Sequence, residues 1–248
     1  MFARFACLLL AGCGRIAFDP LSGGGAPGDT QTGDAFGGPA GSAVSLNGTG
    51  YVSLDSLCPL LVSGFTIDGW FRLGATTQID SDTVAPIGLN SNDMVTNYTL
   101  VLWDWRDGSL AYYDDVYTMR TQNPAAVPGD EWHFFSLTYV PGRAIVYADG
   151  TSFSDAQTPQ TVTSPCHVSL GQELDITGPS DFMVGLIDEV SVWSVAQSPS
   201  EILATMQANV TGSEPNLVGY YRFDGNGADS SGHNRTANLV AATFVAVP

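Results

Sequence analysis

Short apolar runs recur along most of the chain, and Gly, Pro, Asn and Asp residues separate them. In many of these runs apolar and polar residues alternate, which is the period of a β-strand with one buried face. Tight turns are expected at 106–108, which reads Arg-Asp-Gly, and at 141–142, which reads Pro-Gly. The predicted strands are 43–46, 51–54, 65–73, 86–89, 98–105, 109–113, 132–140, 143–148, 167–171, 183–193, 218–223 and 241–247. Such a series favours a sandwich of two antiparallel sheets.

One of these strands, within residues 185–193, carries a carboxylate on each of its faces. Successive side chains of a strand point to opposite faces, so residues two apart are expected to share a face. One face is then formed by Leu186, Asp188, Val190 and Val192. The other face is formed by Ile187, Glu189, Ser191 and Trp193.

A short helix is predicted directly after this strand. Ser198 is placed to cap the first free amides, and Pro199 suits the first helical position. Glu201 stands three residues after the cap, as a capping box requires. The apolar stripe of this helix is expected to consist of Ile202, Leu203 and Met206.

Four segments carry a resemblance to a known family. Residues 185–202 read Gly-Leu-Ile-Asp-Glu-Val-Ser-Val-Trp and then Ala-Gln-Ser-Pro-Ser-Glu-Ile, and residues 217–239 contain Gly-Tyr-Tyr-Arg-Phe-Asp-Gly. Residues 65–73 and 131–150 add two further strands and a hairpin. Over residues 42–245 the chain resembles the laminin-G-like jelly rolls of the concanavalin A-like superfamily.

The resemblance implies an all-β fold, a concanavalin A-like jelly-roll sandwich of two antiparallel sheets with one short helix near the C-terminus. It implies much less about function, because a fold of this kind carries many activities. Members of this superfamily bind glycans, mediate protein adhesion and, in some branches, hydrolyse glycans.

The N-terminus resembles the leader of a bacterial lipoprotein. The apolar run 5–10 ends in Leu-Ala-Gly before Cys13, which is the pattern cleaved ahead of a lipid-bearing cysteine. We therefore expect residues 1–12 to be a signal peptide and Cys13 to carry the lipid. The apolar run is too short to span a bilayer. Gly14 in place of Asp favours the outer membrane, with the domain facing the periplasm or the exterior. The alternatives are an ordinary signal peptide or a buried helix.

Residues 13–41 are expected to form a flexible tether, because Gly, Pro, Ala, Asp and Thr dominate between Asp19 and Ser42 and offer little to bury. The remaining residues, 42–248, suffice for one large all-β domain.

Of the four cysteines, Cys7 leaves with the leader and Cys13 is lipidated. Cys58 and Cys166 remain, and in an exported protein two such cysteines are expected to pair. Closing a loop of this length contributes about 4 to 5 kcal/mol in the chain-entropy model. The alternative is a pair of buried free thiols.

The formal charge is −17, and the cationic residues are eight scattered Arg with no Lys. Nucleic-acid binding requires a clustered cationic face that releases counterions, so no nucleic-acid partner is expected. Direct adhesion to anionic lipid is disfavoured for the same reason. Membrane contact is therefore expected only through the lipid anchor.

Calcium is a candidate cofactor. Asp224, Asn226 and Asp229 place oxygen atoms at short intervals on a Gly-rich turn, and calcium prefers six to eight oxygen ligands. The resemblance adds Asp188, which occupies the place where related folds hold a structural calcium on the convex side. The alternative is that Asp188 and Glu189 accept hydrogen bonds from loop amides while the other residues shape turns.

Catalysis is not expected. Glycanases of this scaffold use a Glu-x-Asp-x-x-Glu strand, in which the nucleophile and the acid share one face. Glu173 and Asp175 match its first half, but Gly178 stands where the second Glu is needed. No Gly-x-Ser-x-Gly or His-Glu-x-x-His motif occurs in the sequence.

Aromatic residues suggest a binding surface. Trp103 and Trp105 share one strand face, and Tyr112 and Tyr113 in the next strand point to opposite faces, so that one tyrosine could extend a platform on which sugars stack. The alternative is that these residues fill the core of the sandwich. The other tryptophans lie in apolar strands and are expected in the core: Trp70, Trp132 and Trp193.

The sequence thus favours a non-enzymatic, lipid-anchored envelope protein whose domain binds a carbohydrate or an extracellular or envelope protein. The alternatives are a cell-surface glycan hydrolase or lyase, and a purely structural adhesion component.

Overall fold

The structure is a computed structural model, and it describes residues 38–74, 83–104, 106–115, 118–119, 125–175, 177–208 and 210–247. These residues all belong to one compact unit, which begins at Asp34. The predicted signal peptide, the attachment residue Cys13 and most of the predicted tether lie outside the described residues.

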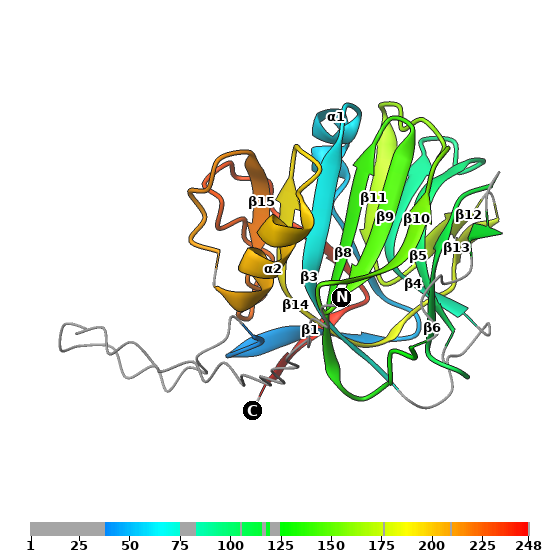
Figure 1. Cartoon of the computed structure of the whole chain (residues 1–248). Coiled ribbons are helices and arrows are strands. Elements are labelled where there is room, and N and C mark those ends of the chain that lie inside the picture. The colour runs from blue at the N-terminus through cyan, green and yellow to red at the C-terminus, as the bar shows by residue number, and fades with distance from the viewer. Residues whose placement is uncertain are drawn as a thin grey trace, which may run out of the picture. The chain divides into compact units, whose positions relative to one another are not determined.

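The first sheet has eight antiparallel strands in the order β10-β9-β8-β3-β14-β1-β17, and β15 also pairs with β14 (Figure 1). Its centre is β14, which bonds to three neighbours. The strands are β1 (Ser42–Asn47), β3 (Phe65–Leu73), β8 (Trp132–Val140), β9 (Arg143–Ala148), β10 (Thr151–Ala156), β14 (Val184–Trp193), β15 (Leu217–Tyr221) and β17 (Thr243–Ala246).

The second sheet has seven antiparallel strands in the order β16-β2-β11-β4-β5-β6-β7. A separate two-stranded hairpin consists of β12 (Glu173–Asp175) and β13 (Gly178–Ser180). The strands of the second sheet are β2 (Tyr51–Ser53), β4 (Thr83–Ser91), β5 (Asn97–Asp104), β6 (Ser109–Tyr113), β7 (Thr118–Met119), β11 (Cys166–Leu170) and β16 (Asn238–Val240).

The core lies between the two sheets, where alternate strand positions supply apolar side chains from both sides. Aromatic pairs across neighbouring strands stack within it, with ring centroids 5.1 Å apart for Phe65 and Tyr139 and 5.4 Å apart for Phe71 and Phe135. Such cross-strand aromatic pairs stabilise a sheet beyond the area that they bury. The predicted all-β sandwich is therefore confirmed.

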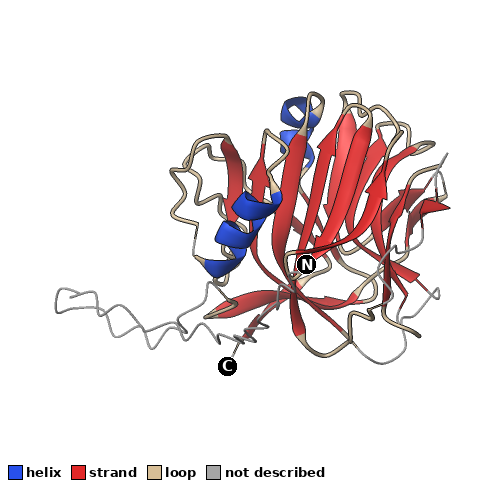
Figure 2. Cartoon of the chain, in the orientation of Figure 1, coloured by secondary structure: helices blue, strands red, loops and turns tan. Residues whose placement is uncertain are grey.

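The helical elements are short (Figure 2). The predicted capping box is present at the start of α2 (Pro199–Gln207), where the Glu201 amide donates to the Ser198 hydroxyl at 3.4 Å. Ile202 is buried against the outer face of the first sheet, but Leu203 is 40% exposed. The apolar stripe of the helix is therefore narrower than predicted. A 3-10 turn, η1 (Asp55–Leu57), and a second helix, α1 (Cys58–Leu61), were not predicted. No helix among the described residues has the length and apolar character needed to cross a membrane.

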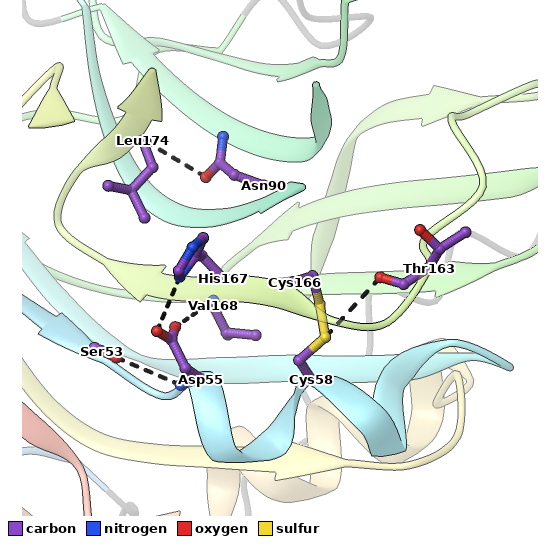
Figure 3. A network of polar contacts seen from close by, with 9 residues as sticks. All are labelled: Ser53, Asp55, Cys58, Asn90, Thr163, Cys166, His167, Val168 and Leu174. Atoms are coloured by element: carbon purple, nitrogen blue, oxygen red, sulfur yellow. Dashed lines mark hydrogen bonds and ion pairs between the residues drawn. A yellow bond between two sulfur atoms is a disulfide. The ribbon is translucent and has the colours of Figure 1, made fainter. Parts of the chain in front are cut away.

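The predicted disulfide is present between Cys58 and Cys166, whose Cα atoms are 5.6 Å apart. It joins the start of α1 to the start of β11 across 108 residues of sequence. Figure 3 shows the bond beside the 3-10 turn that carries Asp55. The disulfide therefore attaches a turn in the N-terminal part of the domain to a strand of the second sheet.

A β-bulge interrupts β14 and changes the predicted faces of that strand. Asp188 pairs with Trp70 and Ser191 pairs with Asp68, so two residues of β14 lie opposite the single residue Gly69. Glu189 takes the left-handed backbone conformation at φ +50°. The extra residue shifts the alternation by one position.

As a result, the prediction that Ile187 and Val190 lie on opposite faces is wrong. Ile187, Val190 and Val192 all point into the main core, and each is fully buried. Trp193 is buried in a smaller cluster with Val210 and Leu217.

Gly69 is the residue that permits this bulge. A Cβ atom at this position would lie 2.8 Å from Cγ2 of Val190 and 3.1 Å from its Cα. Both atoms belong to a fully buried residue, so the contact has little room to relax.

We expect Gly69→Ala to lower the free energy of unfolding by about 1 to 3 kcal/mol, since the added methyl overpacks the bulge. Denaturant unfolding monitored by tryptophan fluorescence measures this loss. Gly142→Ala isolates the cost of backbone strain, because a Cβ atom there meets nothing within 4 Å while its φ of +93° is strained for any residue other than glycine. Equal stability of Gly69→Ala and the parent protein would contradict this account of the bulge.

Candidate functional site

The predicted aromatic platform does not form as expected. Trp103 is only 1% exposed, and its indole nitrogen donates to the Val127 carbonyl at 2.9 Å. Tyr112 is fully buried, and its hydroxyl donates to Asp114 at 2.9 Å. The prediction that these two residues contact a ligand is therefore wrong, and the alternative of core packing holds for both. Trp105 lies outside the described residues.

Tyr113 is the remaining predicted platform residue, and it is half-buried on the opposite side of β6 from Tyr112. That side is the outer face of the second sheet. The same face carries polar side chains in register across three neighbouring strands, where His167 of β11 pairs with Asn90 of β4 and Asn90 pairs with Asn97 of β5. The hairpin β12-β13 contacts β4 beside them. We call Asn90, Asn97, Tyr113, His167 and Glu173 the polar strip.

A chain of side-chain amides holds Glu173 in the polar strip. The Asn97 amide nitrogen donates to Glu173 Oε1 at 2.7 Å, and the Asn90 amide nitrogen donates to the Asn97 carbonyl oxygen. The Asn90 oxygen in turn accepts the Leu174 backbone amide at 3.4 Å (Figure 3). The hairpin is thus fixed to the sheet by these two asparagines.

Carboxylates crowd the Glu173 end of the strip. Asp115 accepts the Asn97 backbone amide at 2.7 Å and its side-chain amide at 3.1 Å. Burial raises the pKa of Tyr113, and the charges of Asp115, Glu173 and Asp175 raise it further. The Tyr113 hydroxyl therefore stays neutral and lies close to these acids.

Glu173 itself is only 7% exposed. Burial holds the pKa of Glu173 well above its usual range, and the charges of Asp175 and Asp181 and a hydrogen bond with the Asp181 carboxyl raise it further. Because two carboxyl groups in contact cannot both ionise easily, the Glu173 and Asp181 pair retains a proton at neutral pH. It can then donate as well as accept a hydrogen bond.

The other end of the strip rests on the disulfide-linked turn. His167 Nδ1 lies 2.9 Å from Asp55 Oδ2, and the other oxygen of Asp55 accepts the Val168 backbone amide at 2.9 Å (Figure 3). Asp55 begins the 3-10 turn directly before Cys58. The orientation of His167 thus depends on the turn that the disulfide anchors.

The carboxylates can be compared with those of a glycosidase. Such enzymes separate their two catalytic carboxyl groups by about 5 to 9.5 Å. The structure does place a third carboxyl, Asp181, beside Glu173 and Asp175. Glu173 and Asp181 hydrogen-bond directly, which is too close for that pair, and Asp175 accepts the Ser180 hydroxyl at 2.7 Å. The Glu173 and Asp181 pair is therefore not spaced as the catalytic pair of a glycosidase is.

The four residues predicted to bind calcium do not converge. Asp229 accepts the amides of Tyr220, Ser231 and Arg235 at 3.1, 2.8 and 3.0 Å, and Asn226 accepts the Ala228 amide at 2.8 Å. These are the hydrogen bonds of turns. Asp229 and Asn226 therefore fit the alternative, in which these residues shape turns, better than the prediction that they are ligands of one calcium ion.

Asp188 and Asp224 behave differently, because both face the segment that leads into β1. Asp188 is fully buried, its Oδ2 accepts the Ala40 amide at 3.2 Å, and its Oδ1 has no partner among the described residues. Asp224 accepts the Ser42 amide at 3.3 Å. A Cβ atom on the intervening Gly41 would lie 2.3 Å from Asp224 Oδ1.

The electrostatics around Asp188 and Asp224 favour a bound cation. Burial raises the pKa of Asp188 to about 8, and the neighbouring charges of Glu189 and Asp224 contribute to the shift. Calcium takes carboxylate, carbonyl and water oxygens, so two carboxylates and the nearby backbone would supply part of its shell. Among the described residues, no group of three or more His, Cys, Asp or Glu side chains is placed to hold a metal.

Two facing antiparallel sheets define a jelly-roll sandwich. The family model described as the concanavalin A-like lectin/glucanases superfamily, of laminin-G type, matches residues 46–203. The chain belongs to this superfamily. No curated protein sequence matches the chain.

Several solved structures share the fold at low sequence identity. A candidate carbohydrate-binding protein from Bacteroides ovatus is 17% identical with a TM-score of 0.62, and the match covers 84% of this chain and 60% of that protein. Domain 4 of an arabinanase from Geobacillus stearothermophilus, in complex with arabinotriose, is 20% identical with a TM-score of 0.50, covering 66% and 76%. The sialidase module CBM40 of Ruminococcus gnavus, bound to α2,3-sialyllactose, is 14% identical with a TM-score of 0.53, covering 66% and 96%.

The raised pKa of Glu173 predicts a pH dependence of stability. A carboxyl whose folded-state pKa exceeds its unfolded value contributes stability below the unfolded pKa and loses it as the pH rises. The unfolded value is 4.5, so the loss begins above that pH and continues up to the raised pKa.

We expect Glu173→Gln to become progressively more stable relative to the parent protein as the pH rises from about 4.5 to about 8, because glutamine keeps the acceptor for Asn97 but does not ionise. Melting temperatures of both proteins across this range measure the difference. Glu131→Gln, at an exposed position, is the control. Parallel pH profiles for Glu173→Gln and the parent would show that Glu173 ionises normally.

Proposed function

We propose that this protein is a non-enzymatic carbohydrate-binding protein of the bacterial envelope, and that the polar strip is its binding site. The observation that carries the proposal is the Glu173, Asn97 and Asn90 hydrogen-bond chain beside the half-buried Tyr113. The Asn90 and Asn97 amides are buried and paired with each other and with their neighbours, so they position the Glu173 carboxyl beside the half-buried Tyr113 phenol. A carboxyl and a phenol match the adjacent hydroxyl groups of a sugar, each of which both donates and accepts hydrogen bonds.

The relatives support this proposal. The solved structures that share the fold include a candidate carbohydrate-binding protein and two modules, one in complex with arabinotriose and one in complex with sialyllactose. The chain spans 60% of the length of the first of these, so the activity of that whole protein is not carried over. A glycan hydrolase is the second candidate, because Asp181 adds a third carboxyl next to Glu173 and Asp175.

Attachment to the outer membrane through Cys13, with residues 13–41 as the tether, completes the proposal. Its support is the Leu-Ala-Gly-Cys sequence after an apolar run. The mass of the mature N-terminal peptide tests it, since an unmodified Cys13 would exclude the anchor.

We expect the purified full-length protein to bind one class of glycans on an array, and Tyr113→Ala to weaken that binding about tenfold by removing a hydrogen bond and a contact surface. Trp132→Ala is the matched control, since it removes a half-buried aromatic side chain from the other sheet. A protein that binds no glycan, or a Tyr113→Ala variant that binds like the parent, would refute the proposal. Release of new reducing ends from a bound glycan would instead support the hydrolase.

Calcium is proposed as a structural ion held by Asp188 and Asp224. If it binds, calcium at about a hundredfold above its Kd stabilises the folded state by about 2.7 kcal/mol, which shifts the melting temperature by several degrees. We expect a chelator to lower the melting temperature of the parent protein and to leave Asp188→Asn unchanged. A melting temperature of the parent that does not respond to chelator removes calcium from this account.

A further inference from the structure

A pocket lies on the outer face of the first sheet, between α2 and the strands beneath it. The residues that line it are Trp70 of β3, Phe134 of β8, Glu189 of β14, Tyr220 of β15, Thr205 and Ala208 at the end of α2, and Val210. The pocket is formed by the sheet opposite to the one that carries the polar strip. Its function can therefore be tested independently of the proposed glycan site.

The β14 bulge places the only acidic side chain of this pocket. With the left-handed backbone at Glu189, Val190 turns into the core while the Glu189 side chain lines the pocket. A non-glycine residue in this conformation is unusual and costs energy, so the fold holds Glu189 here against its backbone preference.

The Glu189 carboxylate is incompletely neutralised. Its Oε2 accepts the Tyr220 hydroxyl. The guanidinium carbon of Arg222 lies 5.6 Å from the centre of the Tyr220 ring. Burial raises the pKa of Glu189, and the Tyr220 hydrogen bond and the Arg222 charge oppose this only in part.

Three aromatic side chains surround this carboxylate. Trp70 and Phe134 meet edge to face, with ring centroids 5.4 Å apart, and Tyr220 completes the wall. Phe134 and Tyr220 are only 2% and 1% exposed, so the half-buried Trp70 is the ring that a ligand can reach. Aromatic faces attract cations, and a carboxylate pairs with them by charge-assisted hydrogen bonds. The chemistry of the pocket thus suits a positively charged group.

The size of the pocket narrows the choice of cation. It has a volume of about 210 Å³ including its open mouth, and its interior admits about one water-sized group. A primary ammonium is of that size, whereas a planar guanidinium is larger. A linear side chain can reach such a hole, but an amine attached directly to a sugar ring cannot enter it without the ring.

We propose that this pocket binds the ammonium group of a lysine side chain presented by a partner protein. A second copy of this chain cannot be that partner, because the sequence contains no lysine. The formal charge of −17 complements a basic partner and raises its rate of association.

The test is a titration of the full-length protein with Nα-acetyl-lysine N-methylamide, followed by the NMR signal of the Trp70 indole. We expect saturable binding at about millimolar concentration. The norleucine analogue, which keeps the carbon stem without the charge, is expected to bind at least tenfold more weakly. Glucosamine is a third ligand, and binding equal to that of the lysine compound would assign the pocket to amino sugars and overturn the proposal.

Two variants test the pocket from different sides. Glu189→Gln removes the charge and keeps the acceptor for Tyr220, and it is expected to weaken lysine binding at least tenfold. Thr205→Leu narrows the pocket from α2 without changing the carboxylate, and it is expected to abolish binding. Glu131→Gln is the control for loss of a negative charge at an exposed position.

Lysine binding that survives both variants, or equal binding of the norleucine compound, would overturn the proposal. No binding of any ligand would mean that the pocket holds water only. Glycan binding by Glu189→Gln is expected to equal that of the parent, so failure here is distinguishable from failure of the polar strip.

Discussion

The bulge opposite Gly69 is the constraint on which the outer face of the first sheet and much of the core depend. β14 is bonded to β1, β3 and β15, so a change of register within it moves side chains against three neighbours at once. The inserted residue brings Ile187 and Val190 into the same core and leaves Glu189 outside. Because Gly69 has no Cβ, the backbone of β14 can approach closely enough for this to happen.

Much of the fold follows from local patterns in the sequence. The period of two in the apolar residues located most of the strands, and the capping box located α2, since both signals are contained in a few consecutive residues. The disulfide was predictable because few cysteines remained to pair. The bulge was not predictable in this way, since it depends on a glycine more than a hundred residues away in the sequence.

The residues of the candidate site were harder to predict from the sequence than the fold. Alternation showed that Tyr112 and Tyr113 point in opposite directions, but it could not show which of them faces the core, because both faces of the second sheet are partly covered. Glu173 attracted notice as half of a catalytic pair, whereas its actual partners, Asn90 and Asn97, come from other strands and belong to no local motif. Closely spaced polar residues such as Asn226 and Asp229 signal turns as strongly as they signal metal ligands.

The position of the Cys58–Cys166 bond has a consequence for when the polar strip becomes complete. The bond lies beside the Asp55 and His167 contact, and Cys166 directly precedes His167 in β11. A reducing environment would remove this covalent link and leave η1 held to β11 by the hydrogen bonds of Asp55 and Leu54 alone. Oxidation of the two thiols therefore completes the support of His167, and a protein synthesised under reducing conditions would lack that covalent support until its cysteines had been oxidised.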